Sequence, residues 1–330
     1  MDNSIKSRFG IGGVGIGVLL VLALLPIAAN LLGQSFYITL FARIMIYAIA
    51  AVGLNLALGY GGMVSLGHAL YIGIGAYAAG ILSFHGVDNG VLQLLVALVV
   101  GALFAVLIGL VCLRTGGMAF IMITLAFSQM LYFVALSLRQ YGGDDGLPLA
   151  QRSIIPGLDL ENGTVFYYTV LVVLAAAVLG VARLVHSHFG WVVQGCKSNE
   201  RRMAALGFPA IRYKLATYVL SALICVVAGY LLANLVRFAS PSYLHWVISG
   251  ELIVMVVLGG IGTLFGPVIG AVVLLSLEEI LTHVSLPLPG MFGGIVKNHP
   301  MAFIGLFIVV MALASRTGLQ GLLRSRKVKS

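Results

Sequence analysis

Charged residues are scarce in this sequence. Asp, Glu, Lys and Arg together make up 9% of its 330 residues, whereas 61% of the residues are hydrophobic. A soluble domain normally carries about 25% charged residues, and the mean hydropathy of +1.10 agrees with the deficit. The composition therefore predicts an integral membrane protein.

Several kinds of chemical site are missing as well. The three cysteines, Cys112, Cys196 and Cys225, show no paired spacing, so no disulfide framework is indicated. No Gly-x-x-x-x-Gly-Lys-Ser/Thr loop occurs, so the chain should not bind or hydrolyse ATP by that route. His186 and His188 lack a neighbouring Cys or Glu cluster, so no metal site is indicated there. We expect no metal, no cofactor and no catalytic residue.

Two arrangements could suggest an intramembrane enzyme, but each has a better interpretation. Ser65 and His68 lie three residues apart at an expected helix start, yet nothing supplies an aligned base and an oxyanion site. N-capping by Ser65 and polar packing or pore lining by His68 are favoured. Asp144 and Asp145 lie in a polar loop, whereas a catalytic pair is expected within facing spans.

Long apolar runs predict the architecture, because a membrane span needs about 20 apolar residues. We expect an all-α polytopic membrane protein of about 8–10 transmembrane helices with glycine-rich helix breaks, forming a single domain over residues 1–330. The shortest run, 246–260, could be a broken or re-entrant helix. The runs cover residues 11–33, 36–58, 66–83, 91–113, 118–138, 164–186, 213–236, 246–260, 264–284 and 300–316.

Lys and Arg gather at the ends of these runs, which explains the net charge of +9 without nucleic-acid binding. With the N-terminus inside, fourteen of the nineteen cations face the cytoplasm, so both termini are expected there. These cations are Lys6, Arg8, Arg114, the six between Arg183 and Lys214, Arg316, Arg324, Arg326, Lys327 and Lys329.

The longest polar interruption on the cytoplasmic side runs from Arg183 to Lys214. Within it Ser198 is the expected N-cap of a helix of about two turns over 200–206, and Gly207 with Pro209 is a stop signal. A solvated connector is one interpretation, and a docking surface for a cytoplasmic partner is the other. The residues assigned to that surface are Glu200, Arg201, Arg202, Ala204, Ala205 and Gly207.

Two glycine-rich stretches, 59–80 and 258–271, interrupt the apolar runs and weakly resemble each other. Interrupted helices in transporters line a cavity or pack against protein, whereas glycines can also allow tight helix crossing. Both interpretations stay open here. From position alone, the residues assigned to a translocation pathway are Ser65, His68, Tyr71, Gly259, Gly260 and Thr263.

Charge within the spans is limited mainly to four candidates, Arg43, Glu251, Glu278 and Glu279. Arg43 could snorkel towards an interface, and Glu251 is expected at a helix start, where negative charge is favoured. A proton-coupled mechanism is therefore only weakly supported.

Three stretches resemble the LivM-like permeases of branched-chain amino-acid ABC importers: residues 59–80, 198–222 and 250–271, in that order. The resemblance implies a permease domain that includes a cytoplasmic coupling loop at 187–214 and a basic cytoplasmic tail at 317–330. It also implies that the short helix at 200–207 is the coupling helix, seated in a groove of an ATPase.

The resemblance further implies a protein of the bacterial inner membrane, surrounded by membrane lipid, that works in a complex. Its partners would be a second related permease, two cytoplasmic ATPase subunits and an extracytoplasmic solute-binding protein. The cargo would be leucine, isoleucine or valine, driven by ATP hydrolysis on the separate subunits. Relatives also serve urea or amides and aromatic acids, and a secondary carrier that works without ATPases is the alternative from another class.

Overall fold

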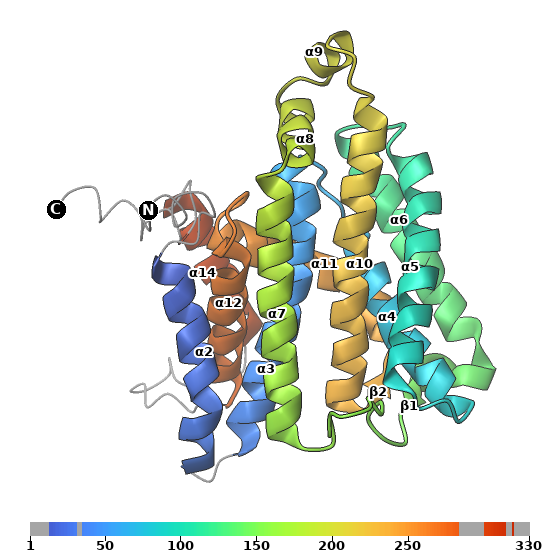
Figure 1. Cartoon of the computed structure of the whole chain (residues 1–330), viewed down its shortest axis with the longest axis vertical. Coiled ribbons are helices and arrows are strands. Elements are labelled where there is room, and N and C mark those ends of the chain that lie inside the picture. Colours follow the sequence, from blue (N-terminus) through green and yellow to red (C-terminus); the bar gives the residue numbers. More distant parts are fainter. Residues whose placement is uncertain (1–12, 32–34, 284–299, 315–318, 320–330) are drawn as a thin grey trace, which may run out of the picture.

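The computed structural model describes residues 13–31, 35–283, 300–314 and 319, which are almost entirely helical (Figure 1). A π-helical turn, Leu56–Tyr60, extends the second helix. The α-helices are α2 (Gly13–Leu31), α3 (Ser35–Asn55), α4 (His68–Phe84), α5 (Gly90–Cys112), α6 (Met118–Ser137), α7 (Gly163–Val185), α8 (His188–Ser198), α9 (Glu200–Ala205), α10 (Ala210–Val236), α11 (Trp246–Gly259), α12 (Gly266–His283) and α14 (Pro300–Ala314).

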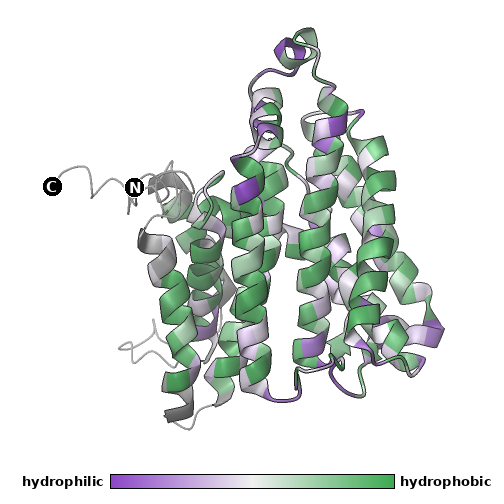
Figure 2. Ribbon diagram, in the orientation of Figure 1, coloured by the Kyte–Doolittle hydropathy of each residue, from purple (hydrophilic) through white to green (hydrophobic). Residues whose placement is uncertain are grey.

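Five of these helical segments are long and apolar enough to cross a membrane. Figure 2 shows apolar residues filling the middle of the bundle, whereas hydrophilic residues gather in α9 and at the loops of the opposite end. This arrangement confirms the expected all-α polytopic membrane protein. The five segments are Phe36–Tyr60, Gly90–Cys112, Met118–Ser137, Gly163–Val185 and Ala210–Val236.

Helices α4 and α11 are shorter than the hydrocarbon core of a bilayer is thick, and each is joined to a glycine-rich break. At 1.5 Å per residue, α4 and α11 are about 26 and 21 Å long, against a hydrocarbon core of about 30 Å. A non-helical stretch at 61–67 precedes α4, and another at 260–265 separates α11 from α12. Residues 246–259 form one continuous short helix, so this segment is not broken, and its re-entrant course stays a prediction. Both glycine-rich stretches do interrupt helices.

Glycine also brings α4 and α10 into backbone contact. A Cβ atom on Gly229 would lie 1.9 Å from the carbonyl oxygen of Ile72, and one on Gly75 would lie 2.1 Å from that of Val226. No side chain fits at such distances, so the two backbones touch as they do at small-residue crossings in membranes. Both interpretations of the glycine-rich stretches therefore apply: some glycines lie in helix breaks, and Gly75 lies at a tight helix crossing.

The end of the bundle opposite α9 is closed by ordered loops. A short strand β1 (Leu147–Pro148) pairs antiparallel with β2 (Phe238–Ala239), so the loop between α6 and α7 is joined to the end of α10. The Arg152 guanidinium donates to the backbone oxygens of Leu160 (2.7 Å) and Asn234 (3.1 Å), so this side chain fastens the loop to α10.

The distribution of charge orients the bundle. Among the described residues, the α9 end carries the cations Arg114, Arg183, Lys197, Arg201, Arg202, Arg212 and Lys214. The loops of the opposite end carry Arg139, Arg152 and Arg237 together with several acids. The α9 end is therefore the cytoplasmic end by the positive-inside rule. The predictions for both termini and for the tail at 317–330 fall on residues that, apart from 319, lie outside the described ranges.

Candidate functional site

The cytoplasmic connection between α7 and α10 contains two helices rather than the single short helix that the sequence predicts. The unpredicted one, α8, begins after Ser187, whose hydroxyl accepts a bond from the Gly190 amide at 3.4 Å. Its buried side chains Val192, Val193 and Cys196 lie on one helical face. This i, i+1, i+4 spacing, following a capping serine, is the signal that could have revealed α8.

Helix α9 starts at Glu200 as predicted, but its N-cap differs from the prediction by one residue. Ser198 is the last residue of α8, and the N-cap is Asn199, whose side-chain oxygen accepts a bond from the Arg202 amide at 3.0 Å. The extended backbone of Asn199, with φ −159° and ψ 100°, separates the two helices. Gly207, with φ +87°, then ends the segment in a conformation that favours glycine.

Helix α9 stands beyond the ends of the other helices (Figure 1). All six residues assigned to the docking surface, Glu200, Arg201, Arg202, Ala204, Ala205 and Gly207, are exposed. Two large apolar side chains of this connection, Trp191 in α8 and Leu206 at the end of α9, are each 66% exposed. A salt bridge from Lys214 to Glu200 fastens α9 to α10. The projecting segment 199–207, here called the prominence, is therefore fastened to α10 while most of its side chains stay exposed.

The first three residues assigned to the pathway do not face a channel within this chain. Ser65, His68 and Tyr71 are all fully buried. Ser65 does not cap α4, because its hydroxyl accepts from the Gly67 amide (3.1 Å) and Gly67 itself holds the N-cap position. Their role in a pathway stays a prediction, and in this conformation His68 and Tyr71 pack against Tyr218 of α10.

The polar partner of His68 is Ser221 in α10. The Nε2 atom of His68 lies 2.8 Å from the Ser221 hydroxyl oxygen, and that hydroxyl donates to the Gly53 carbonyl oxygen at 2.6 Å. Because the hydroxyl has a single proton, the His68 Nε2–H must be the donor in the first bond. The chain of bonds thus joins α4, α10 and α3 in the apolar interior.

Replacing Ser221 with alanine tests this interior connection. The variant leaves the His68 donor and the Gly53 acceptor without their shared partner, which we expect to cost about 1–3 kcal/mol for each buried group. Thermal unfolding of the purified protein in mild detergent measures the loss. Ser137→Ala is the matched control, because that hydroxyl also bonds to a backbone oxygen, but at an exposed site. Equal losses in the two variants would contradict the interior role of Ser221.

The second set of pathway residues lies where the two breaks meet. Gly259 and Gly260 are buried and Thr263 is half-buried. The side chain of Asn55 donates to the Thr263 carbonyl oxygen at 2.8 Å and accepts from the Gly262 amide at 2.9 Å. The two glycine-rich stretches are therefore joined through an asparagine that the sequence interpretation passed over. An amide side chain inside an otherwise apolar span was the available signal.

The charged residues within the spans are placed on α3, α11 and α12. Arg43 and Glu251 are exposed on the surface of the chain, and the Arg43 guanidinium lies 5.8 Å from the centre of the Tyr47 ring. Glu251 is not at a helix start, because α11 begins five residues earlier at Trp246. A small cavity of about 110 Å³ is lined by Leu40, Arg43, Ile44, Leu275, Glu278, Glu279 and Thr282. Charged groups at membrane depth face protein or water. The surface that carries Arg43 and Glu251, here called the charged face, is therefore expected to contact protein or water instead of lipid.

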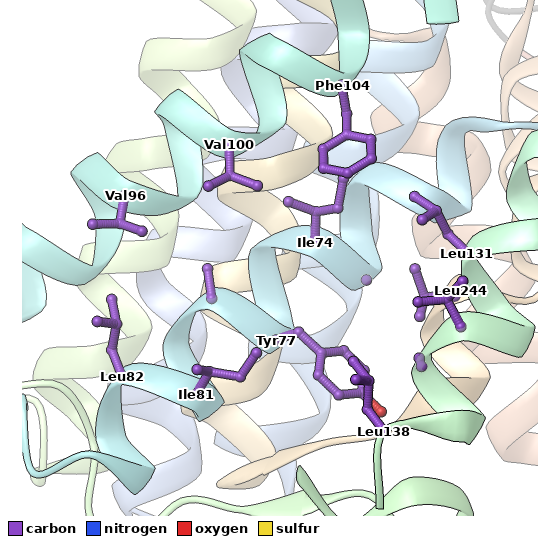
Figure 3. A pocket seen from close by; sticks show the side chains of 14 residues that line it. Ile74, Tyr77, Ile81, Leu82, Val96, Val100, Phe104, Leu131, Leu138 and Leu244 are labelled. Atoms are coloured by element: carbon purple, nitrogen blue, oxygen red, sulfur yellow. The ribbon is translucent and has the colours of Figure 1, made fainter. Parts of the chain in front are cut away.

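A larger groove of about 380 Å³ lies between α4, α5 and α6 (Figure 3). Apolar side chains such as Ile74, Val100, Phe104 and Leu131 line it. Among the described residues, the hydroxyl of Tyr77 is buried here without a hydrogen-bond partner. With no charged group in its lining, the groove is unsuited to the charged head of an amino acid.

No cluster of three or more His, Cys, Asp or Glu side chains suited to a metal occurs in the described part of the chain.

Comparison with known proteins gives a consistent result. The profile of the family described as "Branched-chain amino acid transport system / permease component" matches residues 36–314. The LivM protein of Salmonella typhimurium, a "high-affinity branched-chain amino acid transport system permease protein", is 26% identical over 312 residues, covering 87% of this chain and 70% of that protein.

Two further relatives carry the same description. Escherichia coli LivM is 26% identical over 276 residues, covering 76% of this chain and 65% of its own length. Pseudomonas aeruginosa BraD is 26% identical over 291 residues, covering 83% of this chain and 91% of its own length. No solved structure gives a significant match.

Proposed function

Because this chain belongs to the family of permease components of branched-chain amino-acid transport systems, we propose that it carries leucine, isoleucine or valine through the membrane, driven by ATP hydrolysis on separate subunits. The chain is a multi-pass protein of the bacterial inner membrane. The names of the three relatives favour branched-chain amino acids over urea, amides or aromatic acids as the cargo.

The observation that carries this proposal is the exposed prominence at α9. A carrier that works alone has no need of a short helix fastened by a salt bridge and presented beyond the bundle. An ATPase subunit that seats α9 in a groove would cover Leu206 and the small residues Ala204 and Ala205. Closure of two ATPase subunits would then move α8 and α9 together, since coupling requires an element with two discrete arrangements.

The charged face suggests where the second permease sits. Arg43 and Glu251 are exposed on α3 and α11 at membrane depth, where contact with lipid is costly. We place the second, related permease against this face, with the pathway between the two subunits. An extracytoplasmic binding protein would deliver the amino acid at the end closed by β1 and β2. Residues 1–330 then act as one permease domain, with 187–214 as its coupling loop.

Affinity purification of the tagged chain in mild detergent tests the proposal, with mass spectrometry and an ATPase assay on what is recovered. We expect two ATPase subunits and a second permease to accompany it, and ATP hydrolysis to rise when the binding protein carries its amino acid. A chain that is recovered alone and still moves solute in liposomes would be a secondary carrier. Glu251→Gln should then abolish its transport, because an exposed carboxylate at membrane depth would be the pathway charge.

A further inference from the structure

Lys197 reaches from the cytoplasmic helix α8 to the first helix break. Its ammonium nitrogen donates to the carbonyl oxygen of Gly59 at 2.6 Å, across 138 residues of sequence. Gly59 belongs to the π-helical turn that ends the α3 segment. The last carbonyl groups of a helix have no partner within it and carry partial negative charge, so a cation is well suited to this position.

The contact depends on a glycine that follows the turn. A Cβ atom on Gly62 would lie 2.8 Å from Cγ of Lys197, so the lysine stem runs directly along the backbone there. Gly62 also has φ +70°, a conformation that favours glycine. A residue other than glycine at position 62 would therefore clash with the Lys197 side chain.

The far side of the same turn touches the second break. A Cβ atom on Gly59 would lie 2.6 Å from the amide nitrogen of Gly262, and Asn55 bonds to both Gly262 and Thr263. Helix α8 packs mainly against α7, α9, α10 and the π-helical turn. A hydrogen-bonded route from α8 to the start of α12 therefore runs through Lys197, the turn and Asn55.

We propose that Lys197 is the positioning residue through which movement of α8 and α9 reaches both helix breaks, an inference that rests on the proposed function. When an ATPase displaces α9, the lysine carries the Gly59 carbonyl and the turn with it. Asn55 passes the displacement to residues 262–263 and so to the start of α12. The breaks then respond together, although they lie about 200 residues apart in sequence.

The functional test uses the full complex in liposomes, with its ATPase subunits, second permease and binding protein. Lys197→Met keeps the stem and removes the ammonium group. We expect ATP hydrolysis to stay within about twofold of the unaltered complex while amino acid carried per ATP falls about tenfold, which lies within the usual range of coupling between sites. Lys197→Arg should retain most of the coupling. Arg183→Met, which removes an exposed cation from the end of α7, should change neither quantity.

A second variant separates a lost connection from a misfolded helix. Asn55→Ala leaves α8 untouched and breaks the next link, so it should lower transport per ATP in the same way. Because both residues lie on one route, the double variant should be no worse than the more severe single variant. Full coupling in Lys197→Met, or additive losses in the double variant, would overturn the inference.

Distances between spin labels give a direct readout. One pair, on His188→Cys and Val99→Cys, reports the movement of α8; a second pair, on Ile261→Cys and Val99→Cys, reports the second break. All three positions are exposed. The native cysteines are buried, and burial raises the pKa of the Cys196 thiol, so introduced cysteines are labelled selectively.

Trapping of nucleotide should change both distances in the unaltered complex and only the first in Lys197→Met. A second distance that still changes in Lys197→Met would show another route to the break and overturn the inference. If no ATPase subunit binds the unaltered chain, the proposed function fails and the inference fails with it.

Discussion

Gly207→Trp is expected to abolish ATP-driven uptake while the protein still inserts into the membrane. Gly207 ends the α9 segment with φ +87°, a conformation that costs other residues about 1–2 kcal/mol. No atom lies near the position of its missing Cβ, so a tryptophan ring would project from the exposed surface that we assign to the ATPase groove. The spans are unchanged, and insertion depends on their hydrophobicity. Uptake and ATP hydrolysis in liposomes measure the effect.

Two companion variants separate the possible causes of this loss. Gly207→Asn adopts the same backbone conformation more readily and is small, so it should keep most of the uptake. Glu200→Lys replaces the salt bridge with Lys214 by repulsion between two cations, so it should also uncouple transport from ATP hydrolysis. Normal uptake by a correctly inserted Gly207→Trp protein would remove α9 from the coupling mechanism.

Gly229→Val should strongly destabilise the bundle. The new side chain would begin 1.9 Å from the carbonyl oxygen of Ile72, a backbone atom that cannot rotate away. Helices α4 and α10 would have to separate, at a cost of about 3 kcal/mol or more. We expect a clear fall in the melting temperature in detergent, together with a low yield of monodisperse protein.

Gly180→Val in α7 is the control for this substitution, because nothing lies within 4 Å of the position of its missing Cβ. It introduces the same β-branched residue into another long spanning helix. Similar melting temperatures for the two valine variants would show that the α4–α10 crossing accommodates a side chain at Gly229.

The spans were predictable from the sequence because their signal is local and strong. A run of apolar residues at 91–113 predicted α5, which the structure places at 90–112. Helix α8 was not predicted, since its residues read as part of a polar connector and its apolar face is only three residues wide. The N-cap of α9 was placed at Ser198 rather than Asn199 because both residue types cap helices well.

The contacts made by the site residues could not be predicted, because they join residues far apart in sequence. Ser65, His68 and Tyr71 were assigned to the pathway from their position after a glycine break. The structure buries His68 against Ser221, which follows 153 residues later. The local sequence around Asn55 and Lys197 does not reveal their partners, which lie 207–208 and 138 residues away. The pattern of a single sequence shows which residues are polar, but it does not show which residues they contact in the folded protein.

The connection between Asn55 and residues 262–263 also sets an order for the biosynthesis of this protein. A ribosome delivers Asn55 to the membrane long before Gly262 and Thr263 exist, so the amide group waits in an apolar span without these partners. An unpaired amide in such surroundings costs several kcal/mol. A nascent chain that stops before Gly262 should therefore be less stable at its first break, and we expect it to be a preferred target for membrane proteases.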